Sequence, residues 1–138
     1  MEETRCKKSS ILVVDDDPRI LRSCRFILRS DGYESVDCVS DSTQVKDMLA
    51  ATSYLAVLLD IDMPQVDGIT LLGHIAANYP RTAVIMITGM DQPDSIVNCM
   101  RLGAFDYLVK PIERERLIAS VHPACREHAM VAQNDQPQ

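Results

Sequence analysis

Five short apolar runs alternate along the chain with longer stretches that show helical periodicity. The runs are rich in Val, Ile and Leu, and they lie at residues 11–14, 35–39, 55–59, 83–87 and 105–109. The second run is weaker than the others, which are nearly free of polar breaks. Near-continuous apolar runs are typical of strands that are covered on both faces. The pattern therefore predicts five strands in the interior of the protein.

Each run is followed by a stretch in which apolar residues recur at the three- and four-residue spacing of an amphipathic helix. These stretches lie at residues 20–28, 45–49, 69–76, 96–102 and 117–121. Helix-end signals support them: Pro18 stands near the start of the first stretch and Gly32 just past its end. Ser40 or Asp41 is placed to cap the second stretch, and Gly103 closes the fourth.

Strands that alternate with helices predict an α/β fold with a doubly wound parallel sheet of five strands, because parallel strands need crossover connections. Pro123 falls where the fifth helix would continue, so we expect that helix to stop or kink near His122. The chain becomes polar from there on and reads as a frayed tail. We expect an N-terminal extension at residues 1–9, one domain at 10–122, and a polar tail or the start of a linker at 123–138.

Composition narrows the classes of function. A chain of 138 residues, 46% hydrophobic and 25% charged, is typical of one globular domain. Its formal net charge of −6 argues against non-specific binding to nucleic acid, and no apolar run has the ~20 residues that a membrane span needs. Five cysteines without a C-x-x-C pair indicate reduced thiols, and no secretory signal is recognisable. We expect a cytoplasmic protein.

The residues that follow the strong runs carry the candidate chemistry. They are Asp15, Asp16, Asp60, Thr88 and Lys110. Ligands of open parallel sheets bind outside the carboxyl ends of the strands, where these side chains would meet. Clustered carboxylates without His or Cys favour a hard ion such as Mg²⁺. A hydroxyl and an ammonium beside them could stabilise a phosphoryl group, and a carboxylate could accept it as an aspartyl phosphate.

Each of these residues alone also fits a purely structural role. The acidic run at 15–17 can cap the helix that follows it, with Asp17 as the N-cap. The Thr-Gly pair at 88–89 fits a turn, and the Lys-Pro pair at 110–111 fits a strand end. The chemical interpretation depends on all of them falling at the ends of strands that are predicted independently.

Four motifs in order resemble the receiver domain of two-component response regulators. They are ILVVDDDP at 11–18, LLDIDMPQVDG at 58–68, VIMITG at 84–89 and GAFDYLVKPIE at 103–113. Their order and spacing cover essentially the whole expected domain. The resemblance implies the flavodoxin-like (βα)5 fold of receivers, with strand order 2-1-3-4-5.

The resemblance implies that Asp60 is the phosphoacceptor, which takes a phosphoryl group from the phosphohistidine of a sensor histidine kinase or of a phosphotransfer protein. Asp15, Asp16, Asp60 and the backbone carbonyl of Asp62 would hold Mg²⁺, which Mn²⁺ could replace. Asp62 and Met90 occupy positions that tune the lifetime of the aspartyl phosphate in receivers.

Further roles follow from the same resemblance. Thr88 would hydrogen-bond one phosphoryl oxygen and Lys110 would pair with another, and the bond from Lys110 to Pro111 would be cis. Tyr107 matches the aromatic residue whose rotamer follows the shift of the threonine. This coupling changes the surface formed by the fourth helix, the fifth strand and the fifth helix.

The implied protein is a signalling switch and not an enzyme with a separate substrate, although it assists its own phosphorylation and slow dephosphorylation. Its implied partners are the kinase or phosphotransfer protein and an output domain or downstream protein that regulates transcription. DNA binding would lie outside this chain, and the domain itself would bind neither nucleic acid nor a membrane. A homodimer through the changed surface is also implied.

Two alternatives use the same residues. A receiver-like interaction module that never accepts phosphate would share the fold, although such modules normally lack one of the key side chains, all of which are present here. Asp60-Ile61-Asp62 also resembles the D-x-D motif of haloacid-dehalogenase-type phosphatases, but Pro64 stands where that family has Thr or Val.

Overall fold

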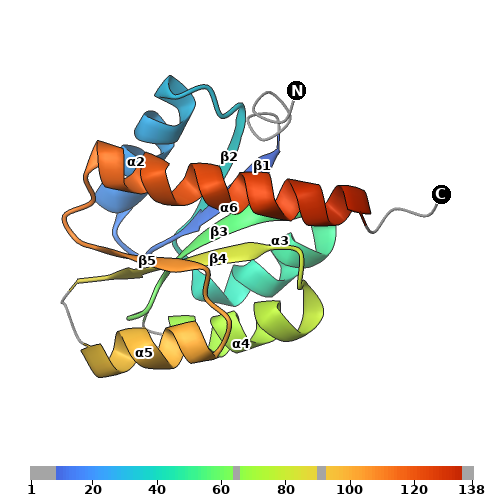
Figure 1. Ribbon diagram of the computed structural model, residues 1–138. Coiled ribbons are helices and arrows are strands. Elements are labelled where there is room, and N and C mark those ends of the chain that lie inside the picture. Colours follow the sequence, from blue (N-terminus) through green and yellow to red (C-terminus); the bar gives the residue numbers. More distant parts are fainter. Residues whose placement is uncertain (1–8, 64–65, 90–92, 135–138) are drawn as a thin grey trace.

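Five strands form one sheet in the computed structural model, which describes residues 9–63, 66–89 and 93–134. The strands are β1 (Ser10–Val14), β2 (Ser35–Val39), β3 (Tyr54–Asp60), β4 (Ala83–Thr88) and β5 (Asp106–Val109). Their order is β2-β1-β3-β4-β5, and every neighbouring pair is parallel (Figure 1). The expected fold class and strand order are confirmed. Pro64 and Met90 lie outside the described residues.

Helices cover both faces of the sheet. They are α2 (Pro18–Ser30), α3 (Val45–Ala51), α4 (Gly68–Asn78), α5 (Pro93–Arg101) and α6 (Arg114–Asn134), with a short 3₁₀ helix η1 (Ser42–Gln44) before α3. α2 and α6 lie on one face, and α3, α4 and α5 lie on the other (Figure 1). The structure is therefore a three-layer sandwich with the sheet in the middle.

Local signals set several helix ends. The side chain of Asp17 accepts a hydrogen bond from the backbone of α2, and Asp41, not Ser40, does the same for η1. Gly32 and Gly103 follow α2 and α5 with φ angles of 100° and 111°, a backbone conformation that favours glycine. Each of these glycines thus lies in a short loop that leads from a helix to the strand that follows it.

The strands divide their side chains between two hydrophobic cores. Ile11 and Val13 of β1 belong to the core under α2 and α6, whereas Leu12 and Val14 belong to the core under α3, α4 and α5. We call these the α2/α6 core and the α3–α5 core. Because both faces of the three central strands β1, β3 and β4 are covered, their runs need no polar positions, which explains the pattern in the sequence.

The last helix differs from its prediction. The expectation was that it stops or kinks near His122; a stop there is wrong, because α6 continues through Pro123 to Asn134, and a kink at that point stays a prediction. A proline inside a helix removes one backbone hydrogen bond and destabilises the helix by ~3 kcal/mol. Ala124 and Cys125, directly after it, are fully buried in the α2/α6 core, and this burial offsets the loss. The packed unit thus extends past residue 122.

Within the described ranges, no helix combines the length and the apolar character that crossing a membrane requires. The same part of the chain contains Cys24, Cys38, Cys99 and Cys125, and none of these four residues is in a disulfide.

Candidate functional site

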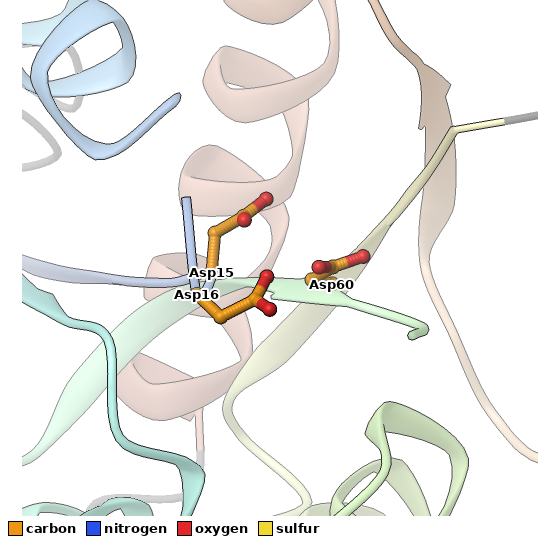
Figure 2. A group of neighbouring side chains, drawn as sticks. All are labelled: Asp15, Asp16 and Asp60. Carbon is orange, nitrogen blue, oxygen red and sulfur yellow. The ribbon is translucent and has the colours of Figure 1, made fainter. Parts of the chain in front are cut away.

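Three carboxylates meet at the carboxyl edge of the sheet. Asp15 and Asp16 follow β1, and Asp60 is the last residue of β3, the neighbouring strand. One carboxylate oxygen from each residue lies within 4.8 Å of the other two. Figure 2 shows the three side chains as a group of neighbours. Asp15 and Asp60 are buried, whereas Asp16 is exposed. We call these three side chains the acidic cluster; it opens to solvent on the side of Asp16.

Lys110 supplies a positive charge to the acidic cluster from the end of β5. Its Nζ lies 3.0 Å from Asp15 Oδ2 and 3.7 Å from Asp60 Oδ2. Its backbone N–H donates to the carbonyl of Thr88 with an N···O distance of 2.8 Å, which fixes the start of the loop after β5 beside the end of β4. The peptide bond from Lys110 to Pro111 is cis.

Backbone donors hold the two buried carboxylates. Asp15 Oδ1 accepts from the N–H of Asp17 at 2.8 Å, and Asp60 Oδ1 accepts from the N–H of Asp62 at 3.2 Å. The second oxygen of each carboxylate faces Lys110. Apart from that ammonium, Asp15 Oδ2 is buried without a hydrogen-bond partner among the described residues. With that ammonium as its only partner there, the carboxylate oxygen still has a lone pair that can accept a metal cation.

The charges in the cluster do not balance. Burial and the negative charge of Asp15 raise the pKa of Asp60 from 3.8 to about 6, although Lys110 and the Asp62 N–H act in the opposite direction. Partial burial acts to lower the pKa of Lys110, but the hydrogen bond that its ammonium donates to Asp15 and the negative charges of the nearby carboxylates outweigh it and raise that pKa. One ammonium thus faces three carboxylates. An all-oxygen site with surplus negative charge fits a hard divalent cation such as Mg²⁺.

Thr88 and Tyr107 lie on neighbouring strands and on the same face of the sheet. Thr88 is buried at the end of β4, one position beyond Ile87, which pairs with Asp60. Tyr107 pairs with Met86, two positions before Thr88, and packs half-buried against the α3–α5 core. Because side chains alternate along a strand, Thr88 and Tyr107 face the same helical layer.

Two residues that position the cluster were not expected from the sequence. A Cβ atom on Gly68 would lie 2.1 Å from the carbonyl oxygen of Asp60, so only glycine packs behind that aspartate. The Asp-Gly pair that ends the second motif was the available signal. The buried hydroxyl of Ser42 accepts from the N–H of Val66 at 2.9 Å and joins the loop after β2 to the loop after β3. Nothing local in the sequence marks this second contact.

Comparison with known proteins agrees with this geometry. The family model for the response regulator receiver domain matches residues 11–122. The transcriptional regulatory protein FixJ of Bradyrhizobium diazoefficiens is 34% identical over 128 residues, which are 93% of this chain and 62% of FixJ. The chain therefore spans less than two thirds of the length of this relative. The family match sets aside the phosphatase alternative.

Solved structures show the same architecture. A CheY-like response regulator receiver domain protein from Methanospirillum hungatei JF-1 superimposes with a TM-score of 0.83 at 27% identity, covering 90% of this chain and 98% of the other. The beryllofluoride-activated NtrC4 receiver domain dimer gives 0.81 at 31% identity, covering 86% and 98%. The family match, the strand order and the carboxylates at the strand ends all lead to the same conclusion. The chain belongs to the family of response regulator receiver domains.

Proposed function

We propose that this chain is a phosphorylation-activated signalling switch in which Asp60 accepts the phosphoryl group. The observation that carries the proposal is the setting of Asp60: it is buried at the end of β3, one carboxylate oxygen is held by a backbone N–H, and the other faces Lys110 at 3.7 Å. Its raised pKa of about 6 still leaves it ionised at neutral pH, as a nucleophile must be.

The donor would be the phosphohistidine of a sensor histidine kinase or of a phosphotransfer protein. A carboxylate oxygen of Asp60 forms a bond to phosphorus while the bond from phosphorus to the imidazole nitrogen breaks, and that nitrogen keeps the electron pair. Lys110 and the hydroxyl of Thr88 would bind the phosphoryl oxygens through charge-assisted hydrogen bonds. The group ends on the protein itself, so the chain assists its own phosphorylation and slow dephosphorylation but turns over no separate substrate.

Asp15, Asp16, Asp60 and the backbone carbonyl of Asp62 would hold Mg²⁺, with Mn²⁺ as a substitute. When bound, the cation supplies neutralising charge for the carboxylates and the phosphoryl oxygens. The chain contributes the arrangement of the ligands. The N–H of Asp17 orients Asp15, and the N–H of Asp62 orients Asp60.

The phosphorylated state would be read at the surface formed by α5, β5 and α6. A phosphoryl group adds close to two negative charges and would draw Thr88 toward it. Tyr107, on the same face, would follow into the space that Thr88 leaves. This biases an equilibrium between two forms of the surface.

The partners of that surface would be an output domain or a downstream protein, which would regulate transcription as the name of FixJ indicates for that relative. Val97, Met100 and Val109 expose apolar area there. They would also serve a homodimer, the form in which the activated NtrC4 receiver domain was solved. DNA contact would belong to a part outside this chain, because a net charge of −6 opposes it here. We place the protein in the cytoplasm.

The intact mass after incubation with acetyl phosphate and Mg²⁺ tests the proposal. We expect the wild type to gain one phosphoryl group, and we expect no gain without Mg²⁺ or in Asp60→Asn. The variant Asp47→Asn, which alters an exposed aspartate of α3, is the matched control and should gain the group. Absence of a gain together with absence of binding to Mg²⁺ or beryllofluoride would contradict the proposal and favour the phosphate-independent module.

A further inference from the structure

β5 is an edge strand, because it pairs with β4 on one side only. Edge strands leave every second backbone N–H and C=O without a partner in the sheet. The N–H of Lys110 donates to Thr88 on β4, so the backbone groups of Leu108 face β4 and those of Tyr107, one position earlier, face outward. The residue expected to respond to phosphorylation therefore sits on an open backbone edge.

Both outward groups of Tyr107 are satisfied by one pair of side chains. The N–H of Tyr107 donates to Asp106 Oδ1 at 2.8 Å, and its carbonyl accepts from Arg116 Nη2 at 2.7 Å. Arg116 also holds Asp106 by a two-pronged contact, with Nη1 3.1 Å from Oδ2 and Nη2 3.1 Å from Oδ1. The four bonds form a closed ring around the backbone of Tyr107. We call Asp106 and Arg116 the edge pair.

The edge pair also joins two elements of the output surface. Asp106 is the first residue of β5, and Arg116 is the third residue of α6. A guanidinium is planar and presents its donors in a fixed fork, so it can bind a carboxylate and a neighbouring carbonyl at the same time. Beside this contact lies a hollow of about 420 Å³ between β5 and the start of α6, lined in part by Tyr107, Ile112 and Arg116.

We propose that Arg116 is a positioning residue of the switch, which acts with Asp106 to pin the backbone of Tyr107 so that only the aromatic side chain turns and α6 moves together with β5. This inference rests on the proposed function. It assigns the coupling between the phosphorylation site and α6 to the edge pair, and it gives Arg116 no contact with the phosphoryl group.

Arg114 provides a matched control on the same helix. Its Nη1 donates to Ser30 Oγ at 2.7 Å and its Nη2 lies 3.8 Å from Asp31 Oδ1, so it joins α6 to the end of α2 and not to β5. Arg114→Gln and Arg116→Gln each remove one charge and one contact to an aspartate. Only the second opens the ring around Tyr107.

The first measurement needs no phosphate. Amide hydrogen exchange of Tyr107 is compared in wild type, Arg116→Gln, Asp106→Asn and Arg114→Gln. Losing a hydrogen bond of ordinary strength speeds exchange roughly fivefold. We expect that acceleration at Tyr107 in the first two variants and wild-type protection in Arg114→Gln. Unchanged protection in Arg116→Gln would overturn the inference.

The second measurement follows amide NMR shifts while beryllofluoride and Mg²⁺, which mimic the phosphorylated state, are added to the full chain. We expect Arg116→Gln to bind with wild-type affinity, judged at the amides of Asp60 and Asp62, and to show a reduced response in β5 and α6. Arg114→Gln should respond fully, and Arg116→Lys should recover part of the response. A full β5 and α6 response in Arg116→Gln, or an equal loss at Asp60, would overturn the inference. A wild type that does not respond at all would contradict the proposed function itself.

Discussion

The molecule contains two ion pairs of nearly equal length in very different settings. Lys110 Nζ lies 3.0 Å from Asp15 Oδ2 in the acidic cluster, and Arg116 Nη1 lies 3.1 Å from Asp106 Oδ2 in the edge pair. The exposed fractions of the side chains are 24% and 0% in the first pair, against 46% and 28% in the second. An ion pair of the same length is therefore mostly buried in the acidic cluster and partly exposed to solvent in the edge pair.

In the two settings, the pKa values of the carboxylates are shifted in opposite directions. Burial and Asp15 raise the pKa of Asp60 to about 6. Burial also acts to raise the pKa of Asp106, but the hydrogen bonds from Arg116 and from the Tyr107 N–H outweigh it and hold that pKa below 3.8. The excess of negative charge at the acidic cluster suits a cation, which the proposed function places there beside the phosphoryl group. The carboxylate of Asp106 instead accepts hydrogen bonds from Arg116 and from the Tyr107 N–H, and it thereby holds the backbone of Tyr107 in place.

The largest effect is expected from Gly68→Ala, which disturbs the acidic cluster from behind. The new methyl group would collide with the backbone of Asp60, which must shift together with its carboxylate. We expect a loss of about 3 kcal/mol or more in the free energy of unfolding, measured in urea. Gly73→Ala in the same helix meets nothing within 4 Å and should raise stability by up to about 1 kcal/mol. Equal stabilities in the two variants would show that the backbone behind Asp60 is not crowded.

Lys110→Met removes the only cation that touches the buried oxygens of the cluster in the described structure. Breaking a buried pair is strongly destabilising, and since Lys110 is partly exposed we expect roughly 2 to 3 kcal/mol at pH 7, below the full penalty. The loss should shrink at pH 5, where Asp60 takes up a proton. Thermal unfolding at both pH values checks this. Lys46→Met, an exposed change on α3, should stay within about 0.5 kcal/mol of wild type.

Asp60→Asn should stabilise the protein although it abolishes phosphorylation. The pKa of Asp60 is about 6 in the folded state against 3.8 for the free group, so the folded state binds more protons between these values. Wild-type stability must then fall as the pH rises from about 4 to 6. Asparagine removes that dependence and should add about 2 kcal/mol at pH 7. A variant that is less stable than wild type at pH 7 would mean that the negative charge of Asp60 is balanced in the cluster.

Arg116→Gln should have the smallest effect on stability. Its partly exposed pair contributes less than about 1 kcal/mol. Because the pKa of Asp106 is lowered in the folded state, the contribution is present above the unfolded pKa of about 3.9 and disappears as the pH falls through the folded value. Urea unfolding at pH 7 and pH 3 should therefore show a smaller difference between the variant and wild type at pH 3. A loss larger than that of Lys110→Met would erase the contrast between the two pairs.

Most of the fold could be predicted because its signals are local. Continuous apolar runs predicted the five strands, and the residue after each strong run proved to lie at the carboxyl edge of the sheet. The exception is Pro123, where a local rule predicted a helix end. The burial of Ala124 and Cys125 against the sheet decides that position, and burial depends on the assembled layers. This burial cannot be predicted from the local sequence around Pro123 alone.

The sequence was sufficient to predict which residues form the site, but not which atoms in it contact one another. The structure brings Asp15, Asp16, Asp60 and Lys110 together as the strand ends indicated. That the ammonium lies nearer to Asp15 than to Asp60 depends on the path of the loop after β5. The roles of Gly68 and of the edge pair depend on residues that meet only after folding, for which the sequence offers at most a weak motif.

The continuation of α6 past Pro123 has a mechanical consequence. A helix of 21 residues is about 30 Å long, and α6 packs against the sheet through Leu117, Val121, Ala124 and Cys125, so Pro123 lies within its packed part. Pro123 removes one backbone bond along the helix, so bending concentrates at that joint. Under the proposed function, a movement of the first turns of α6 would therefore reach the segment after Pro123 as a change of angle at that residue.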